Sequence, residues 1–232
     1  MTISDQLAKI AHEGMQREIC GVVTHDGDLR CSVVRVTNRA SDNNSFLLDE
    51  DELHNIMRTK KVVACWHTHG VGDDHLFSQN DIMGSELSGY VYFVYSIVTE
   101  RINRYAPKRV RLNLANRLDF VPQVFDCFSL VQDYYQDHLE TSLVMFPSDP
   151  VDYRNGVSAE KEEAFCNENK LIEVTEPKNG SIVCMQIGQC GHAFNHVGIY
   201  EDGYVIHHPW KSPVRTERFT RDSTFVKFLH LA

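Results

Sequence analysis

Two histidines and an aspartate stand at a spacing that suits a metal ion. His67 and His69 follow an apolar run over 62–64 that predicts a buried strand. Side chains two residues apart on a strand point to the same side, so both imidazoles are expected to face one way. Asp81 offers a carboxylate oxygen as a third ligand. Three protein ligands with one position left open are typical of a catalytic zinc site, whereas a structural site takes four.

The same residues also allow a purely structural interpretation. Two histidines at this spacing occur by chance in many chains, and this chain has 12 histidines. Ser78 and Asp81, just before Ile82, have the pattern of a helix N-cap followed by an acid three residues later. A helix that begins at Ser78 would also bring both side chains to a cleft. From the residues alone, both interpretations stay open.

A cysteine at a predicted helix start is the second candidate for chemistry. Asp126 has the position of an N-cap, because Leu130, Val131 and Tyr134 follow it at helical spacing. Cys127 then falls in the first turn, where the partial positive charge of the helix end favours a thiolate. The alternative is that Cys127 is a small buried apolar residue, as free cysteines most often are.

Two downstream histidines have the right chemistry to serve that thiol. Strands are predicted over 195–200 and 204–209, joined by a tight hairpin turn. The hairpin is expected to bring His196 and His207 near each other across the strand pair, so that His207 fixes the tautomer of His196. His208 falls on the other face and is the weaker candidate. A thiol nucleophile needs such a base, and the base needs a group that orients it.

Composition limits the class of protein. A length of 232 residues fits two domains of ordinary size, and 42% hydrophobic residues support globular cores. The net charge of −9 argues against nucleic acid as a partner. No run approaches the ~20 apolar residues of a membrane span, and no secretory signal is expected from the first residues. Seven cysteines without a CxxC pair indicate synthesis in a reducing cytoplasm and no disulfide framework.

Around the first site the sequence predicts helices that alternate with strands. Ser4 is expected to cap the first helix, and Leu53, Ile56 and Met57 to form one side of a second helix over 49–60. The other predicted elements are a helix after Ser78 and strands over 21–24, 31–36, 90–98 and 101–105. This pattern predicts an α/β domain.

The sequence also predicts where the domains divide. The first domain is expected to cover 1–106, a linker 107–118 and a second domain 119–232. Residues 101–118 carry six basic side chains and no acidic ones. A solvated connector is the simpler interpretation of this segment, and a contact surface for an acidic partner is the alternative.

The first site resembles the JAMM motif of MPN-domain metalloproteases. That motif combines a His-x-His pair with Ser-x-x-Asp and an upstream glutamate, which Glu18 matches. The resemblance implies a cytidine-deaminase-like α/β fold, a water activated by Glu18 and an oxyanion held by Ser78. Gly70 stands where the family usually has proline. The zinc ligands that the resemblance implies are His67, His69 and Asp81.

The second site is similar to the NlpC/P60 family of cysteine peptidases. Its marks are Asp-Cys at a helix start, a His-x-Gly-Ile-Tyr strand and a polar residue on the next strand, and residues 179–183 match the loop and strand before the histidine strand. The resemblance implies a papain-like α+β core that cleaves amide bonds in peptidoglycan stem peptides. It assigns Cys127 as nucleophile, His196 as general base and His207 as orienting residue. Phe128 stands where the family often has a small residue.

The two domains in this order resemble the tail-tip assembly proteins of lambda-like phages, as do residues 152–156 and the pair His207–His208. That resemblance implies a two-headed hydrolase with peptidoglycan peptides and other tail-tip proteins as partners. It would occur in the host cytoplasm during assembly, and in the virion tail tip and host periplasm during infection. A non-catalytic tail-tip protein and a bacterial peptidase of the same architecture are the alternatives.

Overall fold

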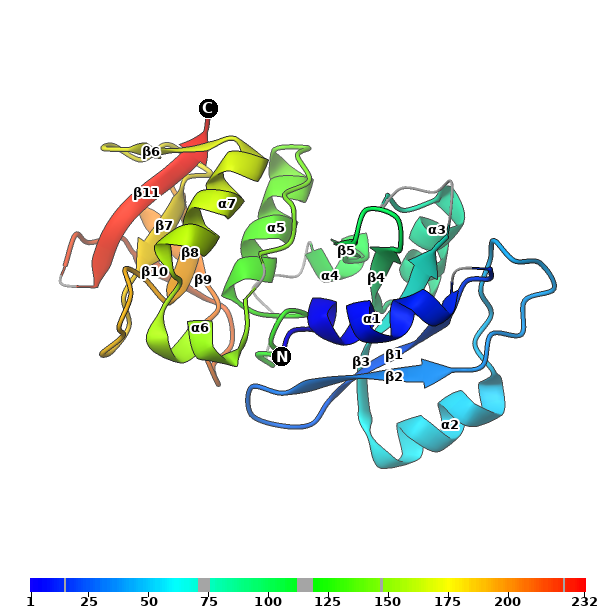
Figure 1. Ribbon diagram of the computed structural model, residues 1–232. Coiled ribbons are helices and arrows are strands. Elements are labelled where there is room, and N and C mark those ends of the chain that lie inside the picture. The colour runs from blue at the N-terminus through cyan, green and yellow to red at the C-terminus, as the bar shows by residue number, and fades with distance from the viewer. Residues whose placement is uncertain (15, 71–75, 112–118, 147, 223) are drawn as a thin grey trace. The chain divides into compact units, whose positions relative to one another are not determined.

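The chain forms two compact units, Met1–Val110 and Arg111–Ala232, drawn as ribbons in Figure 1. The computed structural model describes residues 1–14, 16–70, 76–111, 119–146, 148–222 and 224–232. The predicted linker over 107–118 lies largely outside the described residues, which resume at residue 119. The predicted domain bounds therefore stay predictions.

The first unit is built on a five-stranded sheet with the order β2-β1-β3-β4-β5. Strands β3 and β4 run parallel, and the other neighbours are antiparallel. Helix α1 packs against β2, α2 against β3 and α3 against β4 (Figure 1). The elements are α1 (Ile3–Ala11), the 3-10 helix η1 (His12–Gly14), β1 (Cys20–His25), β2 (Cys31–Val36), α2 (Glu50–Thr59), β3 (Lys61–His69), α3 (Gln79–Ser88), β4 (Val91–Ser96), β5 (Arg101–Tyr105) and α4 (Lys108–Arg111), which ends across the unit boundary.

The centre of this sheet is closely packed around one indole. Trp66 on β3 is fully buried, and its Nε1 donates a hydrogen bond to the carbonyl oxygen of Val34 at 3.2 Å. Gly21 lies opposite Trp66 in the β1–β3 register. A Cβ at residue 21 would lie 2.0 Å from the Val34 oxygen and 2.8 Å from the indole nitrogen. Glycine at this position therefore allows the three strands to approach closely.

Two sequence predictions about helices are wrong in detail. The N-cap of α1 is Thr2 and not Ser4, because Thr2 and Asp5 form a reciprocal capping box with two bonds of 2.9 Å. In α2, Asp49 is the N-cap and the helix itself covers Glu50–Thr59. Met57, which the sequence predicts on the same side as Leu53 and Ile56, is 46% exposed. Only the predicted Leu53 and Ile56 pack against the core cluster that contains Val22 and Tyr92.

The second unit is built on a six-stranded antiparallel sheet with the order β10-β9-β8-β7-β11-β6. Helix α5 packs against β8, which is central in that order. The predicted strand over 204–209 ends earlier, at His207, because Pro209 has no N–H to donate to a neighbour. The elements are α5 (Cys127–His138), α6 (Pro150–Asn155), α7 (Ala159–Asn169), β6 (Leu171–Val174), β7 (Ile182–Met185), β8 (His196–Glu201), β9 (Tyr204–His207), β10 (Arg215–Arg218) and β11 (Phe225–Leu231).

Both units mix helices and sheet, as the sequence predicts. The core of the second unit lies between α5 and the sheet and includes Leu130, Tyr135, Val197 and Ile199. Among the helices of the described ranges, none has the length and apolar character needed to cross a membrane.

Replacing Gly198 by alanine should destabilise the second unit by about 1–3 kcal/mol, because the added methyl group overpacks the hairpin. Its Cβ would lie 2.6 Å from Val205 Cγ1 and 2.9 Å from His207 Cβ. Gly191→Ala is the matched control, since the nearest atom to its Cβ is 3.8 Å away. Urea denaturation measures both; equal unfolding free energies for the two variants would contradict the expected close packing.

Candidate functional sites

The C-terminal end of β3 carries the two histidines of the first site. Beside it, Ile19 N–H donates to Thr68 Oγ1 at 3.1 Å, and Thr68 N–H donates to the carbonyl oxygen of Ile19 at 3.0 Å. This pairing continues the antiparallel β1–β3 register and puts Glu18 opposite His69. Residues that lie opposite each other share a face, so Glu18 faces the same side as His67 and His69.

The three predicted metal ligands meet at one point. His67 Nε2 lies 3.1 Å from His69 Nε2 and 3.2 Å from Asp81 Oδ1. The second carboxylate oxygen, Asp81 Oδ2, lies 3.5 Å from His69 Nε2. All three side chains are buried, and their ligand atoms lie within 4.8 Å of one another. Two imidazole nitrogens and one carboxylate form a donor set that suits zinc and leaves a coordination position open.

The protonation states of this cluster also suit a metal. Burial lowers the pKa of His67, although Asp81 acts in the opposite direction. The imidazole is therefore neutral, which is the form that binds metals. Burial acts to raise the pKa of Asp81, but hydrogen bonds from His67 and His69 outweigh it and hold the pKa well below its usual range. The carboxylate is therefore charged.

The structural and the functional interpretation of Ser78 and Asp81 are compatible with each other. Ser78 is the N-cap of α3: its Oγ accepts a hydrogen bond from Asp81 N–H at 3.2 Å. Asp81 Oδ2 accepts a hydrogen bond from Ser78 N–H at 2.8 Å. The capping box thus fixes the carboxylate that faces the two imidazoles.

A cavity of about 520 Å³ opens on this cluster. Glu18, His69, Ser78 and Asp81 line it, and Phe46, Leu47, Leu48, Leu53 and Tyr92 supply most of its apolar wall. The ring of Phe46 also stacks on the imidazole of His67, with centroids 4.4 Å apart. The structure therefore brings all five predicted residues of the first site together around one cavity or directly behind it.

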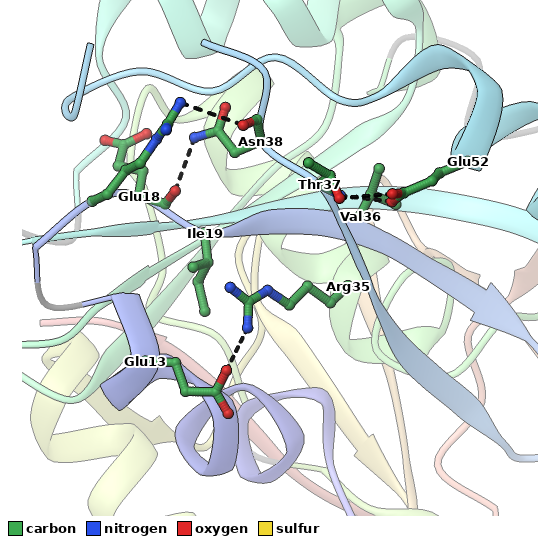
Figure 2. Close-up of a pocket in the computed structure, with 9 residues that line it drawn as sticks. Glu13, Glu18, Ile19, Arg35, Val36, Thr37, Asn38 and Glu52 are labelled. Atoms are coloured by element: carbon green, nitrogen blue, oxygen red, sulfur yellow. Dashed lines mark hydrogen bonds and ion pairs between the residues drawn. The ribbon is translucent and has the colours of Figure 1, made fainter. Parts of the chain in front are cut away.

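Glu18 also lines a second cavity of about 510 Å³, drawn in Figure 2. The Asn38 side-chain amide donates to the main-chain oxygen of Glu18 at 2.8 Å, as the dashed line in Figure 2 shows. Arg35 in this cavity is paired with Glu13. Among these polar groups, the Asn38 amide thus holds the main chain at Glu18.

The second site begins at the capped start of α5. Asp126 is the N-cap, as predicted: its Oδ1 accepts the Ser129 N–H at 2.7 Å, and its Oδ2 accepts the Gln123 N–H at 2.6 Å. The hydroxyl of Tyr153, on α6, donates to the same carboxylate. Cys127 follows directly as the first residue of the helix. Sequence reasoning noted residues 152–156 but missed this role of Tyr153.

The structure brings His196 and His207 together in the β8–β9 hairpin. His196 Nε2 lies 2.8 Å from His207 Nδ1, and the rings are nearly perpendicular at 72°. The register pairs His207 with Gly198, so His196, two residues before Gly198, is its diagonal neighbour on the same face. His208 is fully buried against the ring of Phe120.

The thiol lies against the strand of His196. The backbone N–H of Val197 approaches the Cys127 sulfur, together with the N–H groups of Phe128 and of Cys127 itself. Cys127 is 1% exposed. Within the described ranges, no hydrogen bond joins its sulfur to His196. The structure therefore places the thiol next to the base-carrying strand, with the sulfur covered.

The helix start favours a thiolate at Cys127, but the surroundings of this thiol act in the opposite direction. Burial and, after it, the charge of Asp126 raise the pKa of the thiol, and the surrounding N–H groups do not offset them. Burial, followed by the neighbouring His207 and His208, lowers the pKa of His196 to about 3. The thiol is therefore protonated and the His196 imidazole is neutral, which is the form that can accept a proton.

Sequence reasoning also missed an acid near the histidine pair. Glu217 on β10 has its Oε2 at 3.6 Å from His207 Nε2. No spacing in the sequence indicates this neighbour, because β10 reaches β9 only through the pairing of the strands.

Comparison with known families divides the chain into two domains. Residues 2–113 match the model of Prokaryotic homologs of the JAB domain, and residues 116–230 match the NlpC/P60 family. Among curated proteins, no match was found. An NlpC/P60 domain implies a hydrolase of the cysteine peptidase class. The chain therefore carries a JAB-like domain followed by an NlpC/P60 domain.

Proposed function

We propose that the protein is a two-headed peptidase whose C-terminal head cuts amide bonds in peptidoglycan stem peptides. The observation that carries this proposal is the 2.8 Å contact between His196 on β8 and His207 on β9. The next residue of β8 after His196 is Val197, whose N–H approaches the Cys127 sulfur. Nucleophile, base and orienting group of a thiol peptidase are thereby gathered on α5 and one hairpin.

In this head, His196 takes the proton of the Cys127 thiol as the sulfur attacks the scissile carbonyl carbon. The N–H groups at the start of α5 stabilise the negative charge that develops on the carbonyl oxygen. His196 then gives the proton to the leaving amine, and the C–N bond breaks to leave a thioester. Water, deprotonated by His196, hydrolyses the thioester and restores the thiol. Because Cys127 is 1% exposed, the substrate must displace the groups that cover the sulfur.

The N-terminal head is proposed to be a zinc-dependent peptidase or isopeptidase. His67, His69 and Asp81 would hold the metal. Zinc, when bound, supplies Lewis acidity that makes water a better nucleophile and polarises a carbonyl. Glu18 on the cavity wall accepts a proton from the attacking water and passes it to the leaving amine. Ser78, on the same wall, donates a hydrogen bond to the oxyanion.

The setting that we infer is the tail tip of a long-tailed phage. The order of the two domains supports this inference, together with the resemblance of residues 152–156 and the His207–His208 pair to tail-tip assembly proteins. The partners would be peptidoglycan peptides and other tail-tip proteins. The chain would act in assembly in the host cytoplasm, or from the virion tail tip in the host periplasm.

A non-catalytic tail-tip role is the second candidate. The covered sulfur of Cys127 favours it, because a thiol that substrate never reaches has only a packing role. Gly70, in place of the proline usual after the second histidine, favours it for the first domain. The following two measurements separate these functions.

Cys127→Ala should abolish release of stem-peptide fragments from purified peptidoglycan, by on the order of 10³-fold or more, because the nucleophile is lost. Mass spectrometry of the released fragments measures this. His67→Ala should keep wild-type cleavage, since it alters the other head. Cys190→Ala, which removes a half-exposed thiol, is the matched control. Cleavage by Cys127→Ala at the wild-type rate would exclude Cys127 as the nucleophile.

The wild-type chain purified in the presence of zinc should contain one zinc ion per chain, and His67→Ala should lose it, because the donor set is then incomplete. Elemental analysis by mass spectrometry measures the metal. His54→Ala, which removes an exposed histidine of α2, should retain it. Removing zinc with a chelator should leave peptidoglycan cleavage unchanged. A wild-type chain without stoichiometric zinc would support the scaffold role of the first domain.

A further inference from the structure

A carboxylate on β10 lies at the outer end of the histidine pair. The strand register places Arg215 opposite His207, and Glu217, two residues further, is the diagonal neighbour of His207 on the same face. Glu217 Oε2 is 3.6 Å from His207 Nε2, whereas the other ring nitrogen, His207 Nδ1, is 2.8 Å from His196 Nε2. Each nitrogen of His207 therefore has its own neighbour.

These neighbours determine which nitrogen of each ring carries hydrogen. A neutral imidazole has one N–H donor and one acceptor nitrogen, and an ionised carboxylate only accepts. Because Nε2 of His207 faces the Glu217 carboxylate, the ring hydrogen is favoured on Nε2, and Nδ1 is left as the acceptor. His196 must then donate from Nε2, so its Nδ1 keeps the lone pair that can take the thiol proton.

The charges around His207 keep this arrangement in place. Burial lowers the pKa of His207, and Arg215 acts in the same direction against Glu217, so the ring stays neutral. The Arg215 guanidinium lies 3.6 Å from Glu217 Oε1, which leaves Oε2 for the histidine. Burial, followed by the neighbouring His207 and His208, lowers the pKa of the inner ring, His196, which stays neutral as well.

We propose that Glu217 is a positioning residue of the cysteine peptidase head, and that it sets the tautomer of His207 and, through it, that of His196. The proposal rests on the proposed function of that head. Glu217 acts through His207 and has no contact with the thiol in the described structure. Its side chain is 55% exposed, so water weakens its influence, and the expected loss of rate is modest.

Long-range ¹H–¹⁵N NMR of the full chain tests the tautomer directly, with the His207 signals assigned from their loss in His207→Gln. In the wild type, His207 should carry its hydrogen on Nε2. In Glu217→Ala it should become a mixture of both tautomers, and Glu217→Gln should recover part of the Nε2–H form, because the amide oxygen still accepts. Glu173→Gln is the matched control, as Glu173 pairs with Lys227 in the same sheet. Hydrogen on Nδ1 in the wild type, or an identical tautomer in Glu217→Ala, would overturn the proposal.

Peptidoglycan cleavage supplies the second measurement. Glu217→Ala should lower kcat about two- to fivefold with KM unchanged, Glu217→Gln should restore part of it, and both should keep the wild-type melting temperature. An unchanged kcat in Glu217→Ala would overturn the catalytic part. If no variant and no wild-type chain cleaves peptidoglycan, the proposed substrate fails, while the NMR result still decides the role of Glu217.

Discussion

Both candidate sites depend on a carboxylate that closes the first turn of a helix. The first N–H groups of a helix have no partner inside it, and a nearby acid that accepts one of them fixes the chain at that point. Asp81 does this for α3 and turns its carboxylate toward His67 and His69. Asp126 does the same for α5 and so fixes the position of Cys127, the first residue of that helix. In each site, a local hydrogen bond at the helix start therefore fixes the position of a functional side chain.

This local origin explains how much the sequence could predict. The two-residue spacing of His67 and His69, the caps at Ser78 and Asp126 and the hairpin that carries His196 all follow from rules that act over a few residues. The error at Ser4 also has a local cause. Thr2 is the N-cap because its side chain and that of Asp5 each accept a hydrogen bond from the backbone N–H of the other.

The parts that sequence reasoning missed depend on segments far apart in the chain. Tyr153 reaches Asp126 from 27 residues away, and Glu217 meets His207 only because β10 pairs with β9. The charge state of Cys127 belongs to this class too. A position at a helix start lowers a thiol pKa, but burial by the whole domain raises it, and the position in the helix gives no information about burial.

Asp81 has a consequence for how the first unit responds to a bound cation. Its Oδ2 accepts the Ser78 N–H at 2.8 Å and also faces His69 at 3.5 Å. An ion that draws this oxygen away leaves the Ser78 amide without its acceptor. Thermodynamic reciprocity requires that the integrity of the helix start and the affinity for the ion change together. Hydrogen exchange of the Ser78 amide therefore reports whether an ion is bound, without any substrate.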